Sequence, residues 1–277
     1  MKFVTLKNRN KVPALGQGCW KIGDHPNRRQ QEIDTLRRGV ELGMTLIDTA
    51  EYYGNGRSED LISEAIEGMR DDIYLVSKVM PSNASYQGTI AACERSLGHL
   101  KTDRLDMYLL HWQGSYPVEE TVRAFEKLVA DGKILNWGVS NFDVQDLEDV
   151  FEVPNGKDCA TNQVFYNLSH RGIEYDMFPW AKEEGIPLMA YSPIDESRLV
   201  SRNQLQRVAD NHNATPAQIA LAWSIQSGIV ISIPKASTVA HVEDNAKAAD
   251  IILTAEDNAI LDAAFPPPHR KVNLEFI

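Results

Sequence analysis

The chain has 277 residues, and 28 Lys and Arg residues against 39 Asp and Glu residues give a formal net charge of −11. This acidic balance argues against binding to nucleic acid or to an anionic membrane, because both partners require a concentrated positive surface. With 43% hydrophobic and 24% charged residues, the composition is typical of a globular protein rather than a disordered one.

The cysteines and the first residues indicate the compartment. Cys19, Cys93 and Cys159 are odd in number and scattered, which predicts neither a disulfide framework nor a zinc site. The segment Met1–Lys7 lacks the apolar region of a signal peptide, and no apolar run approaches the ~20 residues that span a bilayer. We therefore expect a soluble, cytoplasmic protein that binds no metal.

In chain order, the segment Phe3–Pro13 contains a turn and predicts a hairpin, after which short apolar runs alternate with helical patterns. The expected strands are Ala14–Gly18, Thr45–Asp48, Ile73–Val79, Met107–His111, Trp137–Ser140, Ala160–Val164, Pro187–Ser192 and Val230–Ile233. The expected helices are Arg29–Leu42, Glu59–Glu67, Tyr86–Leu97, Val118–Ala130, Val144–Phe151, Met177–Glu184 and Asn203–His212. A further helix begins at Thr215-Pro216-Ala217-Gln218, which combines a capping box with proline at the first helical position.

Eight strands separated by helices predict parallel β/α units, since parallel neighbours need crossover connections. Eight such units in 277 residues fit a closed barrel better than an open sheet. The predicted fold class is α/β: a single (β/α)8 TIM barrel over residues 1–277, with the hairpin closing its floor and a short tail from about Pro266. A Rossmann domain is disfavoured, because Gly16-Gln17-Gly18 and Gly54-Asn55-Gly56 both lack the third glycine of G-x-G-x-x-G.

Polar residues follow the predicted strands at the point where each strand ends. They are Asp48, Lys78, His111, Ser140-Asn141, Asn162-Gln163, Tyr191-Ser192 and Lys235. In an α/β barrel the C-terminal ends of the strands carry the chemistry, so we expect these side chains to share one face. Any one of these polar side chains could simply lie in solvent at the end of its strand. Polar residues at the ends of so many successive strands indicate a functional site.

Tyr53, five residues after Asp48, supplies a phenol near this face. A tyrosine has an ordinary pKa of ~10, which is high for a proton donor near neutral pH. A neighbouring ammonium group lowers such a pKa, and a carboxylate can hold that ammonium group in place. The residues therefore suggest acid–base chemistry by Tyr53 with Lys78 and Asp48, while His111 binds a substrate oxygen.

Five strings in this chain, taken together, resemble the aldo-keto reductases. They are Asp48-Thr49-Ala50-Glu51-Tyr52-Tyr53-Gly54, Ser77-Lys78-Val79, Leu110-His111-Trp112, Gly138-Val139-Ser140-Asn141-Phe142 and Ile233-Pro234-Lys235. They occur in the family's order and extend over nearly the whole barrel. The small size resembles the prokaryotic branch that reduces diketogluconate, methylglyoxal and similar carbonyls.

The resemblance implies that Asp48, Tyr53, Lys78 and His111 form the catalytic tetrad of an NAD(P)H-dependent carbonyl reductase. Tyr53 is the implied general acid, Lys78 in a salt bridge with Asp48 lowers its pKa, and His111 orients the carbonyl. The family spacing from Asp48 selects Tyr53 over its neighbour Tyr52. Trp20 and Trp112, with Tyr53 and His111, are the implied substrate-binding residues, and the short tail implies an open site for small aldehydes.

The resemblance also implies a cofactor site along the strand ends. Ser140, Asn141 and Gln163 match the positions that hold the nicotinamide carboxamide, and Tyr191 matches the aromatic residue that stacks on the ring. The segment Ser192-Pro193-Ile194 is expected along the pyrophosphate. The residues expected at the adenosine end are Lys235, Ala236, Ser237 and Thr238, followed by a helix that contains His241, Asp244 and Asn245.

The adenosine end departs from the family pattern at two positions. His241 stands where many members have an arginine for the 2′-phosphate, and Ala236 replaces a hydroxyl residue. Cationic and hydroxyl groups beside a helix N-terminus still suit a 2′-phosphate, so we expect NADPH to be preferred, with NADH as the alternative.

Two other functions remain open from the sequence. A cofactor-binding redox sensor on the same fold predicts tight nicotinamide binding with negligible turnover, and a barrel lyase or isomerase of sugar phosphates predicts no nicotinamide binding. The tetrad residues favour the reductase. We expect a monomer with a small-molecule carbonyl substrate and without nucleic-acid or membrane partners.

Overall fold

The computed structural model describes residues 1–7, 9–195, 198–201 and 203–277. The strands are β1 Phe3–Thr5, β2 Lys11–Pro13, β3 Gln17–Gly18, β4 Leu46–Asp48, β5 Tyr74–Val79, β6 Met107–Leu110, β7 Trp137–Ser140, β8 Asn162–Phe165, β9 Leu188–Tyr191 and β10 Val230–Ser232. The helices are α1 Arg29–Glu41, α2 Arg57–Ala65, α3 Tyr86–Leu100, α4 Val118–Ala130, α5 Val144–Glu152, α6 Met177–Glu184, α7 Asn203–His212, α8 Pro216–Ser224, α9 Val239–Lys247 and α10 Ala255–Ala264. In the described ranges, no helix has both the length and the apolar character needed to cross a membrane.

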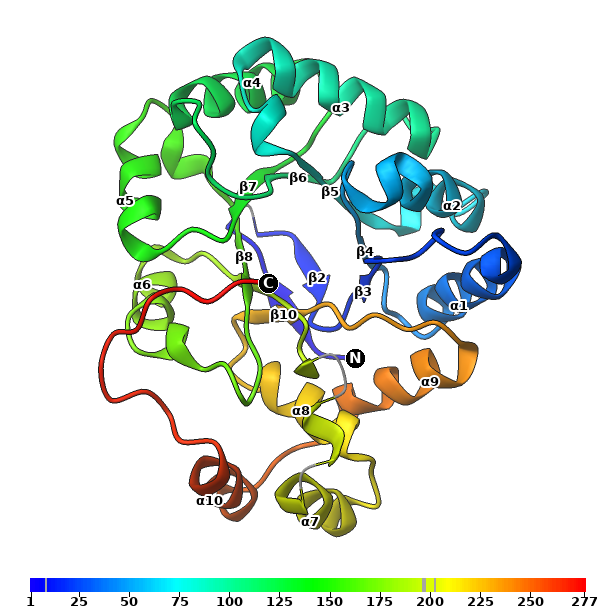
Figure 1. Ribbon diagram of the computed structural model, residues 1–277, viewed down its shortest axis with the longest axis vertical. Helices are drawn as coiled ribbons and strands as arrows, with labels where there is room; N and C mark the ends of the chain where they lie inside the picture. The colour runs from blue at the N-terminus through cyan, green and yellow to red at the C-terminus, as the bar shows by residue number, and fades with distance from the viewer. Residues whose placement is uncertain (8, 196–197, 202) are drawn as a thin grey trace.

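Strands β3 to β10 follow one another around a parallel sheet in chain order, with the helices outside them (Figure 1). The sheet closes where Leu15 pairs in parallel with Ser232, and the Gly16 amide donates to the Ser232 carbonyl at 2.8 Å. A side chain at Gly18 would place its Cβ 2.6 Å from the Ile233 carbonyl oxygen, so this seam requires glycine. The predicted (β/α)8 barrel is confirmed.

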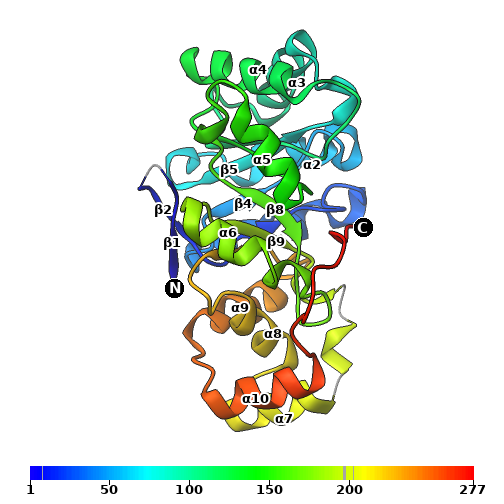
Figure 2. The same ribbon diagram turned by 90° about the vertical axis from the view of Figure 1, so that its left-hand side faces the viewer.

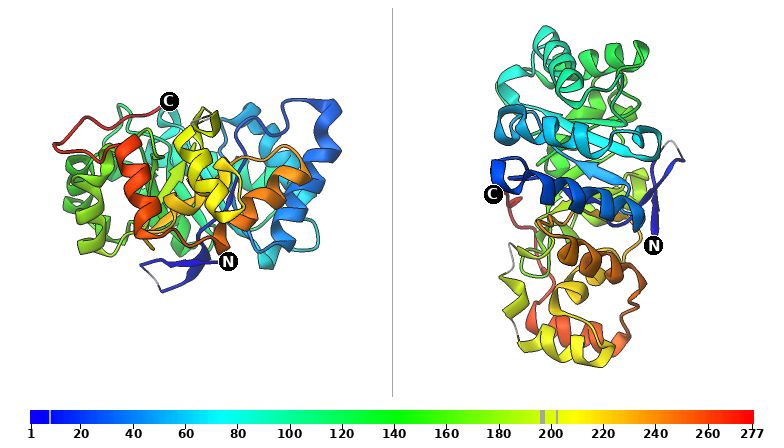
Figure 3. Two further views of the ribbon diagram at one scale, coloured as in Figure 1. Left: turned by 90° about the horizontal axis from the view of Figure 1, so that it is seen from below. Right: turned by 90° about the vertical axis from the view of Figure 1, so that its right-hand side faces the viewer.

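The N-terminal hairpin covers the end of the barrel that lies away from the strand C-termini. Strands β1 and β2 pair antiparallel, and Val4, Leu6 and Val12 are buried against the apolar residues inside the barrel. Figures 2 and 3 show the hairpin on one face of the molecule and the C-terminus on the opposite face. The predicted hairpin within Phe3–Pro13 is confirmed, while Asn8 in its turn lies outside the described residues.

The barrel interior explains the position of the polar residues. Alternate side chains of a strand point inward, so an inward residue is followed by another two positions later. Leu46, Val76 and Leu109 form part of the buried interior cluster. The next inward positions on the same strands are Asp48, Lys78 and His111. A layer of apolar side chains therefore supports a layer of polar ones at the C-terminal face.

The predicted elements match the observed ones with boundary differences of a few residues, but α10 was not expected. Helix α10 begins with a capping box between Thr254 and Asp257, a signal that is readable in the sequence. The box predicted at Thr215 and Gln218 is present at the start of α8.

The segment after α10 runs back across the C-terminal face of the barrel (Figure 1). Lys271 Nζ lies 3.2 Å from an Asp143 oxygen and 3.1 Å from an Asp176 oxygen, and Glu275 lies 3.0 Å from His170 Nδ1. The main chain of Ile277 hydrogen-bonds the Tyr191 hydroxyl. The short tail was expected to leave the site open, but it reaches a residue of the candidate site.

Candidate active site

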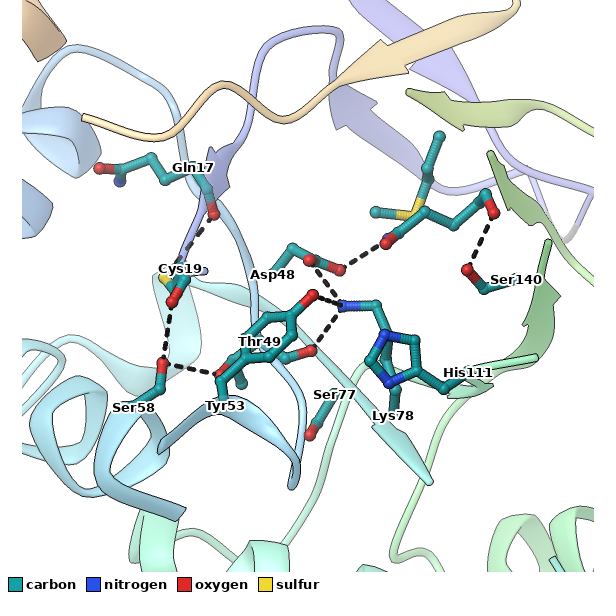
Figure 4. A network of polar contacts seen from close by, with 12 residues as sticks. Gln17, Cys19, Asp48, Thr49, Tyr53, Ser58, Ser77, Lys78, His111 and Ser140 are labelled. Carbon is teal, nitrogen blue, oxygen red and sulfur yellow. Dashed lines mark hydrogen bonds and ion pairs between the residues drawn. The ribbon is translucent and has the colours of Figure 1, made fainter. Parts of the chain in front are cut away.

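The four residues predicted as catalytic lie together at the C-terminal ends of β4, β5 and β6 (Figure 4). Lys78 Nζ lies 2.7 Å from Asp48 Oδ2 and 3.3 Å from the Tyr53 hydroxyl. The ring centroids of Tyr53 and His111 are 5.8 Å apart. The structure thus brings a phenol, an ammonium group, a carboxylate and an imidazole into one cluster.

A tight turn places Tyr53 in this cluster. Tyr53 is followed by three residues with left-handed backbone: Gly54, Asn55 and Gly56 have φ values of 59°, 53° and 89°. Such left-handed backbone is favourable for glycine and tolerated by asparagine, which accounts for the Gly-Asn-Gly string in the sequence. The turn reverses the chain between β4 and α2 and directs the phenol toward Lys78 (Figure 4).

The ion pair at the centre of the cluster is buried. The side chains of Lys78 and Asp48 are 0% and 2% exposed. Burial alone lowers the pKa of Lys78, but Asp48 and Tyr53 outweigh it and raise that pKa, so the ammonium group stays charged. The Thr49 carbonyl accepts a second hydrogen bond from Lys78 Nζ at 2.7 Å. This main-chain acceptor was not foreseen, because no side-chain pattern signals it.

The pKa of Tyr53 differs from the sequence-based expectation. Lys78 acts in the expected direction and lowers it, but desolvation of the buried phenol is the larger effect. The pKa of Tyr53 is therefore raised above its ordinary value, and the phenol is protonated at neutral pH. Charge neighbours can be anticipated from a sequence, whereas the extent of burial depends on the folded barrel.

His111 is electrically neutral in this environment. Burial, with a smaller contribution from the charge of Lys78, lowers the pKa of His111 to about 2. Its Nδ1 is buried and has no hydrogen-bond partner among the described residues. A neutral imidazole can donate one hydrogen bond and accept another, which suits binding of an oxygen rather than pairing with a carboxylate.

The residues expected around the nicotinamide form a hydrogen-bonded group. The Tyr191 hydroxyl donates to Asn141 Oδ1 at 2.9 Å, and Asn141 Nδ2 donates to Ser140 Oγ at 3.2 Å. Ser140 Oγ donates to the Gln163 carbonyl at 2.9 Å, and Gln163 Nε2 donates to Asp48 Oδ1 at 2.7 Å. The group is therefore connected to the catalytic cluster, and its role toward a cofactor stays a prediction.

The three residues after β9 are Ser192, Pro193 and Ile194, which were predicted to lie along the cofactor's pyrophosphate. Ser192 has a φ of 49°, an unusual value for serine, and its carbonyl accepts from Asn167 Nδ2 at 3.0 Å. Pro193 is buried and Ile194 is half-buried against the barrel core. Ser192, Pro193 and Ile194 directly follow Tyr191, and their contact with a cofactor stays a prediction.

The residues predicted to bind the adenosine end of a cofactor lie in the segment before α9 and within that helix. Lys235 Nζ donates to Ser237 Oγ at 2.6 Å, and Thr238 caps α9 by accepting from the His241 amide at 3.2 Å. Ala236 is half-buried, His241 is exposed and Asn245 is buried.

Asp244, also predicted at the adenosine end, binds residues at the start of α8. Its carboxylate accepts from Thr215 Oγ1 at 2.9 Å and from Gln218 Nε2 at 2.7 Å, which fastens α9 to α8. Both oxygens therefore have structural partners, and a contact with a cofactor stays a prediction.

Two tryptophans predicted to bind substrate stand at the mouth of the site. The ring of Trp20 lies 4.9 Å from that of Tyr53 in an edge-to-face arrangement, and Trp112 lies 4.8 Å from His111. They are 44% and 38% exposed, so both present apolar surface beside the catalytic cluster.

Glu51 is a supporting residue that was not expected from the sequence. Its Oε1 accepts from the Met80 amide at 2.8 Å and from Asn83 Nδ2 at 2.9 Å, while Oε2 pairs with Arg95 at 3.1 Å. These bonds hold the loop after β5, and thus the strand that carries Lys78. Its place in the string between Asp48 and Tyr53 is the only sequence signal for this role.

Comparisons with known proteins show the family of the chain. The model of the Aldo/keto reductase family matches residues 14–265. The chain is 46% identical to "Methylglyoxal reductase YeaE" of Escherichia coli (strain K12), over 100% of this chain and 99% of that protein. It is 34% identical to "Glyoxal reductase" of Bacillus subtilis (strain 168), over 94% of this chain and 91% of that protein.

Among solved structures, an aldo-keto reductase from Klebsiella pneumoniae in complex with NADPH is similar at a TM-score of 0.98 and 47% identity, covering 100% of this chain and 99% of that one. A second Klebsiella pneumoniae structure, in complex with NADP and acetate, gives a TM-score of 0.98 and 46% identity with full coverage of both chains. Since the family model spans nearly the whole barrel and these relatives match along their full length, the chain belongs to the aldo/keto reductase family of oxidoreductases.

Proposed function

We propose that this aldo-keto reductase reduces small aldehydes and ketones, reactive dicarbonyls such as methylglyoxal among them, with NADPH as the reductant. The observation that carries the proposal is the Tyr53 hydroxyl, 3.3 Å from a fully buried Lys78 and beside His111, whose Nδ1 has no hydrogen-bond partner in the described ranges. The two curated relatives named above support the substrate class by their names, methylglyoxal reductase and glyoxal reductase.

The residues present fit the cofactor. Ser140, Asn141 and Gln163 offer hydroxyl and amide groups of the kind that bind a carboxamide, and they lie directly beside the catalytic cluster. Lys235 and the N-terminus of α9 offer a cation and main-chain amides, which suit phosphate groups. When bound, NADPH supplies the hydride that is added to the carbonyl carbon.

Tyr53 acts as the proton donor in this scheme. The carbonyl oxygen gains negative charge as its carbon is reduced, and the Tyr53 hydroxyl gives that oxygen a proton. Because burial raises the pKa of Tyr53, the phenol is in the donor form at neutral pH. Lys78 lies close enough to stabilise the tyrosinate that remains, and Tyr53 then regains a proton from solvent.

His111 and the tryptophans position the substrate. The neutral imidazole of His111 hydrogen-bonds the carbonyl oxygen without adding a charge that would repel Lys78. Trp20 and Trp112 contact the substrate's carbon groups on the solvent side of the cluster. The exposed apolar rings of these two tryptophans suit the carbon groups of small carbonyl compounds.

The test is consumption of NADPH, and separately of NADH, with methylglyoxal and a panel of aromatic aldehydes. We expect oxidation that requires both the protein and the aldehyde, with higher kcat/KM for NADPH. Cofactor binding, detected by tryptophan fluorescence, without oxidation across the panel would contradict the reductase and favour the redox-sensor alternative. Absence of both binding and oxidation would refute the cofactor assignment.

A further inference from the structure

The segment that precedes α9 is in contact with the first turn of α1. Gln31 Nε2 donates to the Ser237 carbonyl at 2.7 Å, immediately before Thr238 caps α9. Further along the same pair of helices, Arg38 Nε lies 2.8 Å from Glu243 Oε1. The helices therefore run side by side in the same direction, with their N-termini together (Figure 1).

Arg28 lies at the same end of α1 as Gln31. It occupies the N-cap of α1, three residues before Gln31, and side chains three apart on a helix are neighbours. Arg28 is exposed and makes no ion pair within the described part of the chain. Its neighbour Arg29 is different, because it is held by Glu64 at 2.7 Å.

Several cations converge around Lys235. Burial lowers the pKa of Lys235; the charge of Glu32 opposes this shift, while the positive charges of Arg28 and Lys21 add to it, which shows that both cations lie near Lys235. The nearby acid, Glu32, is 1% exposed and accepts a hydrogen bond from the Gly23 amide at 2.9 Å. In a protein of net charge −11, a group of cations at one place forms a local positive surface that attracts an anion.

We infer that Arg28 on α1 is a specificity-determining residue, which contacts the 2′-phosphate of NADPH from the side opposite His241. Gln31 supports it by fixing the main chain at Ser237. The inference rests on the proposed function and deepens it, because it assigns recognition of the phosphate to α1 as well as to α9. An arginine can bind a phosphate through two parallel hydrogen bonds, whereas a neutral histidine adds no charge.

The experiment measures binding of adenosine 2′,5′-bisphosphate and of ADP by fluorescence titration, without turnover. For Arg28→Gln, we expect the Kd of adenosine 2′,5′-bisphosphate to rise about tenfold, as for the loss of one charge-assisted hydrogen bond. The Kd of ADP should change less than about twofold. Arg28→Lys, which keeps the charge, should restore part of the affinity.

Arg29→Gln is the matched control, since it removes the adjacent arginine that pairs with Glu64. It should leave both dissociation constants near their original values. Equal weakening of the two ligands by Arg28→Gln, or equal effects of Arg28→Gln and Arg29→Gln, overturns the inference, because either result indicates a general charge effect.

The controls separate this inference from the proposed function. If the unmodified protein binds adenosine 2′,5′-bisphosphate no better than ADP, the NADPH preference itself is refuted. If it shows that preference and Arg28→Gln retains it, only the role of Arg28 is refuted.

Discussion

Lys78 and Asp48, at the floor of the site, are 0% and 2% exposed, whereas Lys235 and His241, at its rim, lie in contact with solvent. Each side chain of the buried pair has at least two hydrogen-bond partners within 2.7 Å. The rim depends on capping bonds and on contacts between α1 and α9. Under the proposed function, the floor carries the acid–base chemistry, and the rim, with its exposed charges, is the part that selects between the two cofactors.

The largest effect is expected at the floor. Tyr53→Phe should lower kcat by about 10²–10⁴-fold, because the proton donor is lost while the ring and its packing against Trp20 are kept. NADPH binding by fluorescence should remain within about threefold of its original value. Tyr52→Phe is the control, since Tyr52 is 47% exposed and makes no hydrogen bond to Lys78. Turnover of Tyr53→Phe close to that of the unmodified enzyme would show that another group protonates the substrate.

Lys78→Met tests whether the floor is also a structural anchor. The substitution leaves the buried Asp48 carboxylate without its cation, and the free energy of unfolding should fall by about 3–5 kcal/mol. Urea denaturation measures this loss. The double variant Lys78→Met/Asp48→Asn removes both charges, so it should recover stability without recovering turnover. A stable single variant would be inconsistent with the ion pair as an anchor.

The floor was predictable from the sequence because its residues obey strong local rules. Asp48, Lys78 and His111 each end a short apolar run, and a barrel brings all strand ends to one face. Gly54 and Gly56 mark the turn that carries Tyr53. The direction of the Tyr53 pKa was not predictable, because desolvation outweighs the charge of Lys78 only once the barrel has closed over the phenol.

The rim and the tail were less predictable because their positions depend on long-range contacts. Nothing in the sequence places Gln31 beside Ser237, 206 residues away along the chain. The tail after α10 has no periodic pattern, and its course depends on single ion pairs such as Lys271 with Asp143 and Asp176. Helix α10 differs, since a local sequence signal, the capping box of Thr254 and Asp257, marks its start.

A substitution in the tail after α10 can alter access to the site without changing the buried Lys78–Asp48 pair. Lys271→Ala removes the bonds to Asp143 and Asp176, so the tail should leave Tyr191 more often. We expect the KM of bulky aromatic aldehydes to fall by about three- to fivefold, with little change for methylglyoxal, because the larger substrates gain most from an open mouth. Lys247→Ala, on the exposed side of α9, is the control. An unchanged KM for every aldehyde would place the tail outside the substrate path.

The smallest effect is expected at the rim, where His241→Arg adds a permanent charge near the proposed 2′-phosphate site. His241 is exposed, so solvent screens the gain, and we expect NADPH affinity to improve by about two- to fivefold and NADH affinity to stay constant. Measured Kd values for both cofactors check this, and equal changes would mean that His241 does not face the phosphate. If Arg28 already supplies a cation there, the gain should be larger in an Arg28→Gln background. A gain of the same size in both backgrounds would show that the two side chains act on different parts of the cofactor.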